Sequence, residues 1–569
     1  MSLPSAEPAG GRQGFFRSAG TVSAAVFLSR ITGVVREMAM ARLFGAGQAY
    51  DAFLLGFRIP NLARNLFAEG ALSSAFVPTF TRYLATKGKR AAAELSDLTA
   101  TMLLAIAGAA CLAGMVFSPA LVRLMAPGFA QTPGKFELAV RLTRVMFPFL
   151  ALVALAAQAM GVLNACGQYG VPALASVVFN IGSVAIGLAL GFALGQSRGE
   201  GLIVSMAYGV LAGGLLQLLW QMPSLWRAGF PFRPRWNPAD EGLRAIFRLM
   251  APAFLGNAAV QINTMVNTNI ASSLTDASGH VLNGPVSWLG YAFRFLQLPL
   301  GLFGVAIATA TLPEISRSAA RARLDEFGTS LGRSLRLTLF LAIPSSVGLA
   351  VLGRSMIATV YQWGRFQASD TRQTATALAC YSVGLAGYSA IKLLAPAFYA
   401  LNDARTPMLV SVGSVAVNLV VATMLVRQFG MGHAGLALST SLVALAGAAA
   451  LFALLQARLA AGNAGMDGRR LAVSVLKIGA AASAMGVACR ASSHVVHMLA
   501  GAGKASQMAD VAVSIPLGAA VFCAAAYGLR TEELNELWTA CYTARRNAFR
   551  PEVGDPPAGN RSSSGGPGA

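Results

Sequence analysis

The sequence is poor in charged residues, histidine and cysteine. Only 12% of its 569 residues are charged, whereas a soluble protein carries roughly 25%. A soluble enzyme of this length would therefore lack a polar exterior. Four histidines, with no Asp-x-Asp pair and no Walker loop, give little support to a membrane glycosyltransferase or phosphatase. Six cysteines without C-x-x-C spacing predict neither a disulfide framework nor a metal site.

Long apolar runs fill most of the chain, of which 55% is hydrophobic. A helix needs ~20 apolar residues to cross a bilayer, and about 14 runs meet that length. We therefore predict an all-α polytopic membrane protein. The predicted spans cover residues 18–43, 50–80, 98–124, 142–165, 171–196, 201–226, 244–275, 286–313, 334–353, 374–400, 406–427, 434–457, 471–490 and 510–530.

The net charge of +21 comes mainly from loops. Arginine and lysine gather in loops on the same side as the amino terminus, which predicts that both termini are cytoplasmic. The charge is thus explained by membrane topology, and no nucleic-acid partner is predicted. The predicted divisions are a cytoplasmic amino-terminal segment (1–17), an N-lobe of helices 1–6 (18–226), a cytoplasmic inter-lobe loop (227–243), a C-lobe of helices 7–12 (244–457), two appended helices (471–530) and a cytoplasmic tail, disordered at its end (531–569).

An internal duplication supports the two lobes. Residues 76–82 (FVPTFTR) align with 311–317 (TLPEISR) at a spacing of about 235, and the same spacing places 171–174 (VPAL) on 406–409 (TPML). Because each repeat would hold six spans, the lobes run in the same direction across the membrane. This arrangement is typical of transporters whose substrate site lies between two halves.

Charged residues inside the predicted spans are the candidate site. Each costs ~2.5–3.5 kcal/mol at membrane depth, so such residues usually line a cavity or pair with each other. One interpretation is internal ion pairing, with Glu37 and Glu69 as partners of the arginines. The residues are Arg30, Arg36, Glu37, Asp51, Arg58, Arg64, Glu69, Arg294 and Lys392.

Arg294 favours a second interpretation, an anion site. Its span contains no acidic residue, and the repeat aligns it to within one position of Arg58. Arginine suits phosphate because its planar donors match paired oxygens. We also expect the helices to break at Gly33 and Pro60, which would free backbone N–H groups for the same anion.

These residues lie in motifs that resemble the lipid II flippase family (MurJ/MviN), a branch of the multidrug/oligosaccharidyl-lipid/polysaccharide exporter superfamily. The resemblance covers about residues 18–530. The Pro-Asn-Leu and Phe-Ala-Glu-Gly-Ala elements are specific to this branch. The matching segments are 29–36 (SRITGVVR), 43–47 (LFGAG), 51–53 (DAF), 60–62 (PNL) with Arg64, 67–71 (FAEGA), 394–399 (LAPAFY), Asp403 and 406–407 (TP).

The resemblance implies a transporter, rather than an enzyme, in the bacterial inner membrane. Fourteen helices would enclose a cationic central cavity and move lipid II, an undecaprenyl-diphosphate-linked disaccharide pentapeptide, to the periplasmic leaflet by alternating access. The last two helices would hold its polyprenyl tail. Partners would be lipid II, membrane lipids and the cell-wall synthesis machinery. No cofactor is implied, and ion coupling stays open.

The resemblance also implies roles for individual residues. Arg36, Arg64 and Arg294 would bind the diphosphate. Supporting or gating roles would fall to Arg30, Glu37, Asp51, Arg58, Glu69 and Lys392.

Three alternatives stay open at this point. The chain could flip another polyprenyl-diphosphate-linked glycan, of O-antigen or exopolysaccharide type, or act as a cell-wall scaffold without transport. A cationic-drug exporter is disfavoured, because its site would need carboxylates where this chain has arginines. His494 and His497 are three residues apart, but we place them in a periplasmic loop without a carboxylate partner and predict no metal there.

Overall fold

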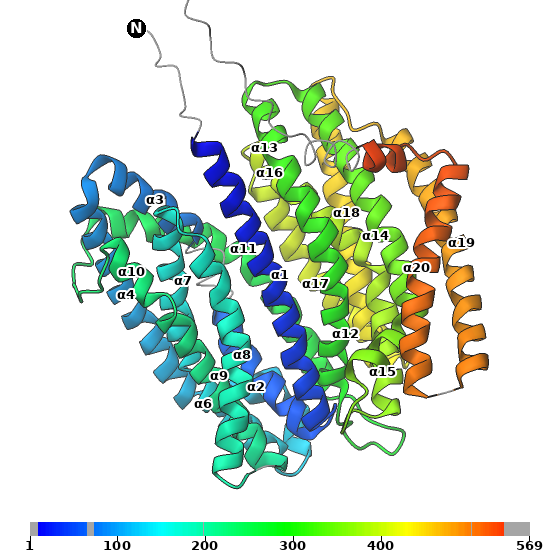
Figure 1. The fold of residues 1–569 in the computed structure, drawn as a ribbon, viewed down its shortest axis with the longest axis horizontal. Coiled ribbons are helices and arrows are strands. Elements are labelled where there is room, and N and C mark those ends of the chain that lie inside the picture. The colour runs from blue at the N-terminus through cyan, green and yellow to red at the C-terminus, as the bar shows by residue number, and fades with distance from the viewer. Residues whose placement is uncertain (1–9, 65–72, 197, 502, 540–569) are drawn as a thin grey trace, which may run out of the picture.

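The computed structural model describes residues 10–64, 73–196, 198–501 and 503–539, and these are almost entirely helical (Figure 1). Their one β feature is an isolated bridge between Thr275 and Val281. The elements are α1 (Gly10–Phe44), α2 (Gln48–Arg64), α3 (Ser73–Thr86), α4 (Gly88–Val116), α5 (Ser118–Met125), η2 (Pro127–Gln131), α6 (Lys135–Met146), α7 (Phe149–Ala165), α8 (Gly170–Ala193), α9 (Gly199–Leu219), α10 (Met222–Ala228), α11 (Glu241–Ser272), α12 (Pro285–Pro299), η3 (Leu300–Val305), α13 (Ala306–Ala320), α14 (Leu324–Tyr361), α15 (Ala368–Val383), α16 (Leu385–Ala400), α17 (Arg405–Arg427), α18 (Gly432–Ala460), α19 (Gly468–Ala500) and α20 (Lys504–Gly528).

The all-α polytopic fold is confirmed. Within the described residues, 10 helical segments are long and apolar enough to cross a membrane, or 11 if the bent pair α15–α16 is one span. The three other predicted spans correspond to α1, to α2 with α3, and to α11. α1 carries several charges, and α2 has only 17 residues. The predicted count of fourteen is reached if these three also cross.

The expected breaks at Gly33 and Pro60 are wrong, because α1 and α2 run as continuous helices through both residues. A Cβ on Gly33 would lie 3.6 Å from Nδ2 of Asn180, an ordinary contact distance, so α8 packs beside α1 here without requiring a glycine. The irregular backbone occurs instead at η3, a π-helical turn directly after Pro299. Proline and π-turns are common causes of a local change in helix direction.

Small residues allow close helix pairs within the first part of the chain. α8 packs along α9, where a Cβ on Gly209 would lie 2.2 Å from the backbone oxygen of Ser183. α1 packs along α8 and also touches α14. Figure 1 shows α2–α10 on one side of α1 and α12–α20 on the other. The exact lobe boundaries stay a prediction.

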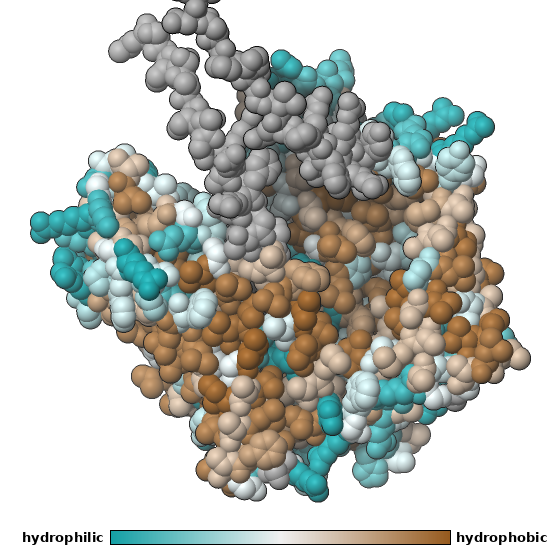
Figure 2. All heavy atoms as spheres, in the orientation of Figure 1, coloured by the Kyte–Doolittle hydropathy of each residue, from teal (hydrophilic) through white to brown (hydrophobic). Residues whose placement is uncertain are grey.

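The carboxyl-terminal helices form a hairpin that packs on α14. α19 extends to Ala500, ten residues beyond the predicted end, so His494 and His497 lie in this helix. The prediction of a loop there is wrong because the helix continues through polar residues. The tail begins with helical residues 532–539, and its predicted disordered end lies outside the described residues. Figure 2 shows the hydrophobic surface of these helices and of the first half, which is the surface expected to face lipid.

Candidate functional site

Glu37 and two arginines form a charged cluster between α1 and α12. The Nε of Arg294 lies 2.6 Å from Oε1 of Glu37, and Nη2 of Arg36 lies 3.7 Å from the same oxygen. The side chain of Arg294 is 49% exposed, whereas that of Glu37 is 11% exposed. Nη1 of Arg294 also donates to Oε1 of Gln297 on the same helix at 3.3 Å. Glu37 and Gln297 therefore engage two of the three guanidinium nitrogens, while about half of the side chain stays accessible to a ligand.

Aromatic rings hold the second arginine in place. The guanidinium of Arg36 lies 5.9 Å from the ring centroid of Phe57 and 5.5 Å from that of Phe179. Cation–π contacts of this kind stabilise a charge through the face of the ring and do not use the in-plane N–H donors. Arg36 is thus oriented by α2 and α8 from either side.

The charged residues lie at a common depth. Arg36 is eight residues from the end of α1, Arg294 is nine from the start of α12, and Arg58 is ten from the start of α2. At 1.5 Å per residue these positions are about 12–15 Å from the helix ends. Arg58 donates from Nη1 to the hydroxyl of Thr268 on α11. The structure therefore places three of the predicted arginines in one layer of the molecule.

Aromatic side chains pack together at the end of the molecule where α1 ends and α2 and α12 begin. The hydroxyl of Tyr361 donates to Oε2 of Glu37 at 3.2 Å, and its ring packs 4.7 Å from that of Tyr291. Tyr291 stacks on Tyr50 at 5.0 Å and donates to the backbone oxygen of Gly45 at 3.2 Å. The segments around α1–α2 and α12–α14 are thus joined at this end.

Asp51 lies in a separate contact at the same end. Its Oδ1 accepts from the backbone N–H and the hydroxyl of Ser287, at 2.9 and 2.5 Å. Its Oδ2 accepts from the N–H of Gly284 at 2.8 Å and from Nζ of Lys135 at 2.9 Å. Because α12 begins at Pro285, the carboxylate caps a helix amino terminus. Asp51 therefore joins α2, α6 and α12 and lies outside the arginine cluster.

Arg30 and Lys392 are not brought into the cluster. The guanidinium of Arg30 lies against Gly301 in η3, where a Cβ would be 2.5 Å from its nitrogens. Lys392 is exposed on α16. The side chain of Arg64, at the end of α2, and all of Glu69 lie outside the described residues.

Comparison with known proteins identifies the family. The family model for the lipid II flippase MurJ matches residues 40–503. The lipid II flippase MurJ of Burkholderia cenocepacia is 36% identical over 450 residues, covering 78% of this chain and 84% of its own. The chain belongs to the lipid II flippase MurJ family. The probable lipid II flippase MurJ of Vibrio cholerae is also 36% identical, over 76% of this chain and 81% of its own.

Solved structures agree with this assignment. A lipid II flippase MurJ in an inward closed conformation superposes with a TM-score of 0.70 at 25% identity, covering 89% of this chain and 99% of the other. An inward-facing MATE family transporter of the MOP superfamily superposes with a TM-score of 0.61 at 17% identity, covering 78% and 94%. The second likeness concerns the fold alone. The chain is therefore a multi-pass membrane protein with a transporter fold.

Sequence reasoning missed several residues of this end of the molecule. Lys135 is fully buried, and its Nζ also donates to Oδ1 of Asn283 at 2.8 Å and lies 4.2 Å from the ring centroid of Phe129. In the sequence it follows a Pro-Gly turn and resembles a solvated loop residue. The aromatic contact of Tyr361 with Tyr291 likewise joins segments that are far apart in the chain, which no local pattern indicates.

The two histidines of α19 also differ from expectation. Nε2 of His497 lies 3.5 Å from Oδ2 of Asp510 on α20, and Nδ1 lies 2.8 Å from the hydroxyl of Ser506. The predicted absence of a carboxylate partner is therefore wrong. Within the described parts of the chain, no group of three or more His, Cys, Asp or Glu side chains is placed to hold a metal ion.

Proposed function

We propose that this chain moves lipid II from the cytoplasmic to the periplasmic leaflet of the bacterial inner membrane by alternating access. The arginine cluster supports the proposal. Arg36, Arg58 and Arg294 lie in one layer with Glu37 as the nearby acid, which leaves an excess of two positive charges. A diphosphate carries compensating negative charge and paired oxygens that fit arginine.

Glu37 would act as the internal counter-ion of the arginine cluster. Its carboxylate occupies the Nε side of Arg294, and the half-exposed guanidinium retains further donors. An arriving diphosphate would compete with Glu37 for both arginines. Because Tyr361 also donates to Glu37, displacement of this carboxylate would loosen the contact between α1 and α14. Substrate binding would thereby be coupled to opening of the closed end.

The proposed orientation of the chain in the membrane follows the positive-inside rule, with both termini cytoplasmic. The hairpin α19–α20, which packs on α14, would hold the polyprenyl tail. The proposal needs no resident cofactor, and the membrane potential acting on the arginine cluster is the proposed driver. Proposed partners are membrane lipids and the cell-wall synthesis machinery that makes and uses lipid II.

Replacement of Arg294 tests the proposal. Arg294→Ala, expressed as the cell's only lipid II flippase, should leave the lipid-linked precursor in the cytoplasmic leaflet while the protein still inserts. Arg372→Ala is the matched control, since this arginine is exposed on α15. Leaflet distribution can be measured by cleavage of outer-leaflet precursor in intact spheroplasts. Normal outer-leaflet precursor with Arg294→Ala would refute the site.

A conservative change separates charge from geometry. Arg36→Lys keeps the positive charge but loses the planar donors that bind two oxygens at once. If paired contact matters, this variant should also fail to deliver precursor to the outer leaflet. Full transport by Arg36→Lys would mean that charge alone suffices.

A further inference from the structure

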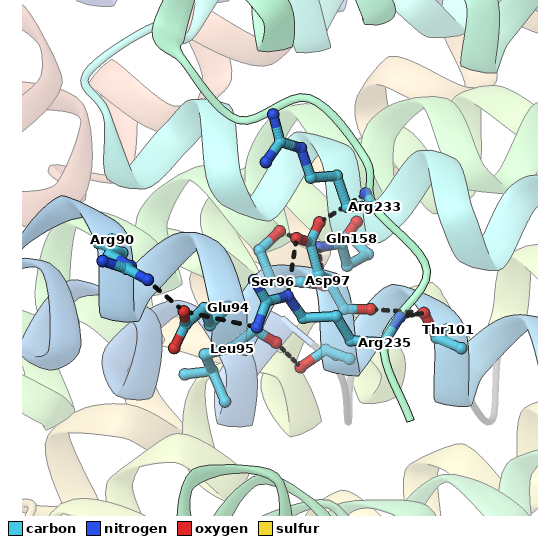
Figure 3. A network of polar contacts seen from close by, with 10 residues as sticks. Arg90, Glu94, Leu95, Ser96, Asp97, Thr101, Gln158, Arg233 and Arg235 are labelled. Atoms are coloured by element: carbon cyan, nitrogen blue, oxygen red, sulfur yellow. Dashed lines mark hydrogen bonds and ion pairs between the residues drawn. The ribbon is translucent and has the colours of Figure 1, made fainter. Parts of the chain in front are cut away.

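Residues 229–240 form an extended segment, here called the strap, which connects α10 to α11 (Figure 3). Gly229 ends α10 with φ +84°, a conformation that favours glycine, and the chain turns there into the strap. Phe230 is buried, with its ring 5.4 Å from that of Phe80. The strap is therefore anchored at its start by an aromatic contact.

Two backbone hydrogen bonds fix the strap along α4. The N–H of Arg233 donates to Oδ1 of Asp97 at 3.0 Å, and the N–H of Arg235 donates to Oγ1 of Thr101 at 3.1 Å (Figure 3). The uncharged run of α4 begins at Leu98 and continues to the end of this helix at Val116. The strap consequently crosses α4 where its apolar, membrane-spanning part begins.

Aromatic side chains at this level point away from the protein. Trp226, Phe232 and Trp236 are 61%, 45% and 66% exposed. The chain has only six tryptophans, and a third one, Trp220, which is 45% exposed, lies just before α10. Exposed tryptophan is unfavourable in water but is enriched where a membrane protein meets the lipid headgroups.

Positive charge is interleaved with these rings. Three acids lie on the strap or beside it on α4, and all are engaged. Glu94 lies 3.6 Å from Nε of Arg90 and 3.4 Å from Nη1 of Arg235, Asp97 binds the strap backbone, and Oδ1 of Asp240 accepts from the N–H of Leu243 in α11. Six cations against these three acids leave an excess of three positive charges. The cations are Lys87, Lys89, Arg90, Arg227, Arg233 and Arg235, all of them exposed.

We propose that the strap and the start of α4 form a docking surface for acidic phospholipid headgroups of the cytoplasmic leaflet. The headgroup phosphates would bind Arg233, Arg227 and Lys89, and the rings of Trp226 and Trp236 would lie at the boundary between headgroups and acyl chains. The charge and the exposed rings occur together on α10, the strap and the start of α4, which matches the chemistry of an anionic lipid surface. This surface is separate from the arginine cluster and does not depend on its function.

Docking would have a mechanical consequence for the two halves of the molecule. The strap is the connection between α10 and α11, and its backbone is hydrogen-bonded to α4. A lipid-bound strap would hold the α4 side of the molecule at the membrane surface. The helices beyond α11 would then move relative to this fixed side.

The test compares lipid retention by two double variants of the full-length chain. Each protein is exchanged into detergent micelles containing equal parts of phosphatidylglycerol and phosphatidylcholine, and bound lipids are counted by native mass spectrometry. The first variant, Arg233→Gln with Arg235→Gln, keeps both backbone N–H donors of the strap. The control is Arg372→Gln with Arg427→Gln. It removes two exposed arginines, one near the start of α15 and one at the end of α17, on the side of the membrane that the predicted topology places away from the strap.

We expect the strap variant to bind phosphatidylglycerol about tenfold more weakly, and the control to bind it as the unmodified chain does. Each cation at an anionic surface strengthens binding about fivefold, and Arg235 already shares its charge with Glu94 and Asp97. Phosphatidylcholine retention should change little in either variant. Trp236→Ala should weaken retention of both lipids, because the ring contributes without regard to headgroup charge.

Three outcomes would overturn the proposal. The first is equal phosphatidylglycerol retention by the strap variant and the unmodified chain, which would favour an acidic protein segment as the occupant. The second is an equal loss in the control. The third is a fall in the melting temperature of the strap variant that accounts for lost lipid, which melting each protein in lipid-free detergent would reveal.

Discussion

Replacing Asp51 by asparagine should destabilise the end of the molecule at which α2 meets α12. Asp51 and Lys135 are both fully buried and lie 2.9 Å apart. The carboxylate also accepts three hydrogen bonds from Gly284 and Ser287. The amide that replaces it would retain one acceptor oxygen, and Lys135 would keep a positive charge with only the neutral partners Asn283 and Phe129.

The expected loss follows from the burial of the pair. Breaking a buried ion pair by removing one partner costs about 3–5 kcal/mol, because the other charge is left uncompensated. Lys135→Met should cost a similar amount, since the Asp51 charge would then lose its cation while keeping the dipole of α12. The double variant should cost less than the sum of the two, since it leaves no buried charge and the coupling of contacting residues is typically about 0.5–3 kcal/mol.

The melting temperatures of the four proteins, measured in one detergent, provide the assay. The unmodified chain should melt highest, and the double variant should melt above the temperature expected from adding the two single losses. Insertion into the membrane is checked by fractionation, so that a failure to fold is not mistaken for instability. If the double variant loses as much as both single variants together, the two side chains act independently and the reasoning is wrong.

Three smaller perturbations test other contacts. Tyr361→Phe removes the hydroxyl that donates to the carboxylate of α1, and should lower the melting temperature by the equivalent of about 1 kcal/mol; an unchanged value would contradict this. Gly128→Ala places a Cβ 2.1 Å from a backbone oxygen of α11, whereas Gly108 has open space, so Gly128→Ala alone should reduce the yield of folded protein. Hydrogen bonds from the N–H and hydroxyl of Thr406 hold the pKa of Asp403 below its ordinary value. Its contribution is therefore present at neutral pH and lost as the pH falls through the lowered pKa; Asp403→Asn should melt below the unmodified chain at neutral pH, with a difference that shrinks in acid.

Much of the architecture could be predicted from the sequence because the bilayer restricts the choices. A membrane-spanning segment must satisfy its own backbone hydrogen bonds, so long apolar runs are read directly as helices. The boundaries of α17 and α18 agree with the predicted spans to within a few residues. The predictions failed where this constraint is weak. α1 and α2 continue through Gly33 and Pro60, and α19 extends through polar residues to Ala500.

The candidate site was only partly predictable. A charge inside an apolar run is costly at membrane depth, so it can be recognised from the sequence alone. This criterion identified Arg36, Glu37, Arg58 and Arg294. Their pairing was not predictable, since Glu37 meets Arg294 across a long stretch of intervening chain. Lys135 gave no signal at all, because nothing local distinguishes a buried lysine from a solvated one in a loop.

The sequence by itself determined that this protein lies in a membrane, the approximate positions of its helices and the sign of its internal charge. These properties depend on composition along the chain, because each segment inserts into the bilayer according to its own length and hydrophobicity. Only the tertiary structure decided which charges meet, which end of the molecule is closed by aromatic rings, and which face of the strap is exposed. Those outcomes depend on contacts between distant segments, where a few ångströms separate an ion pair from an isolated charge.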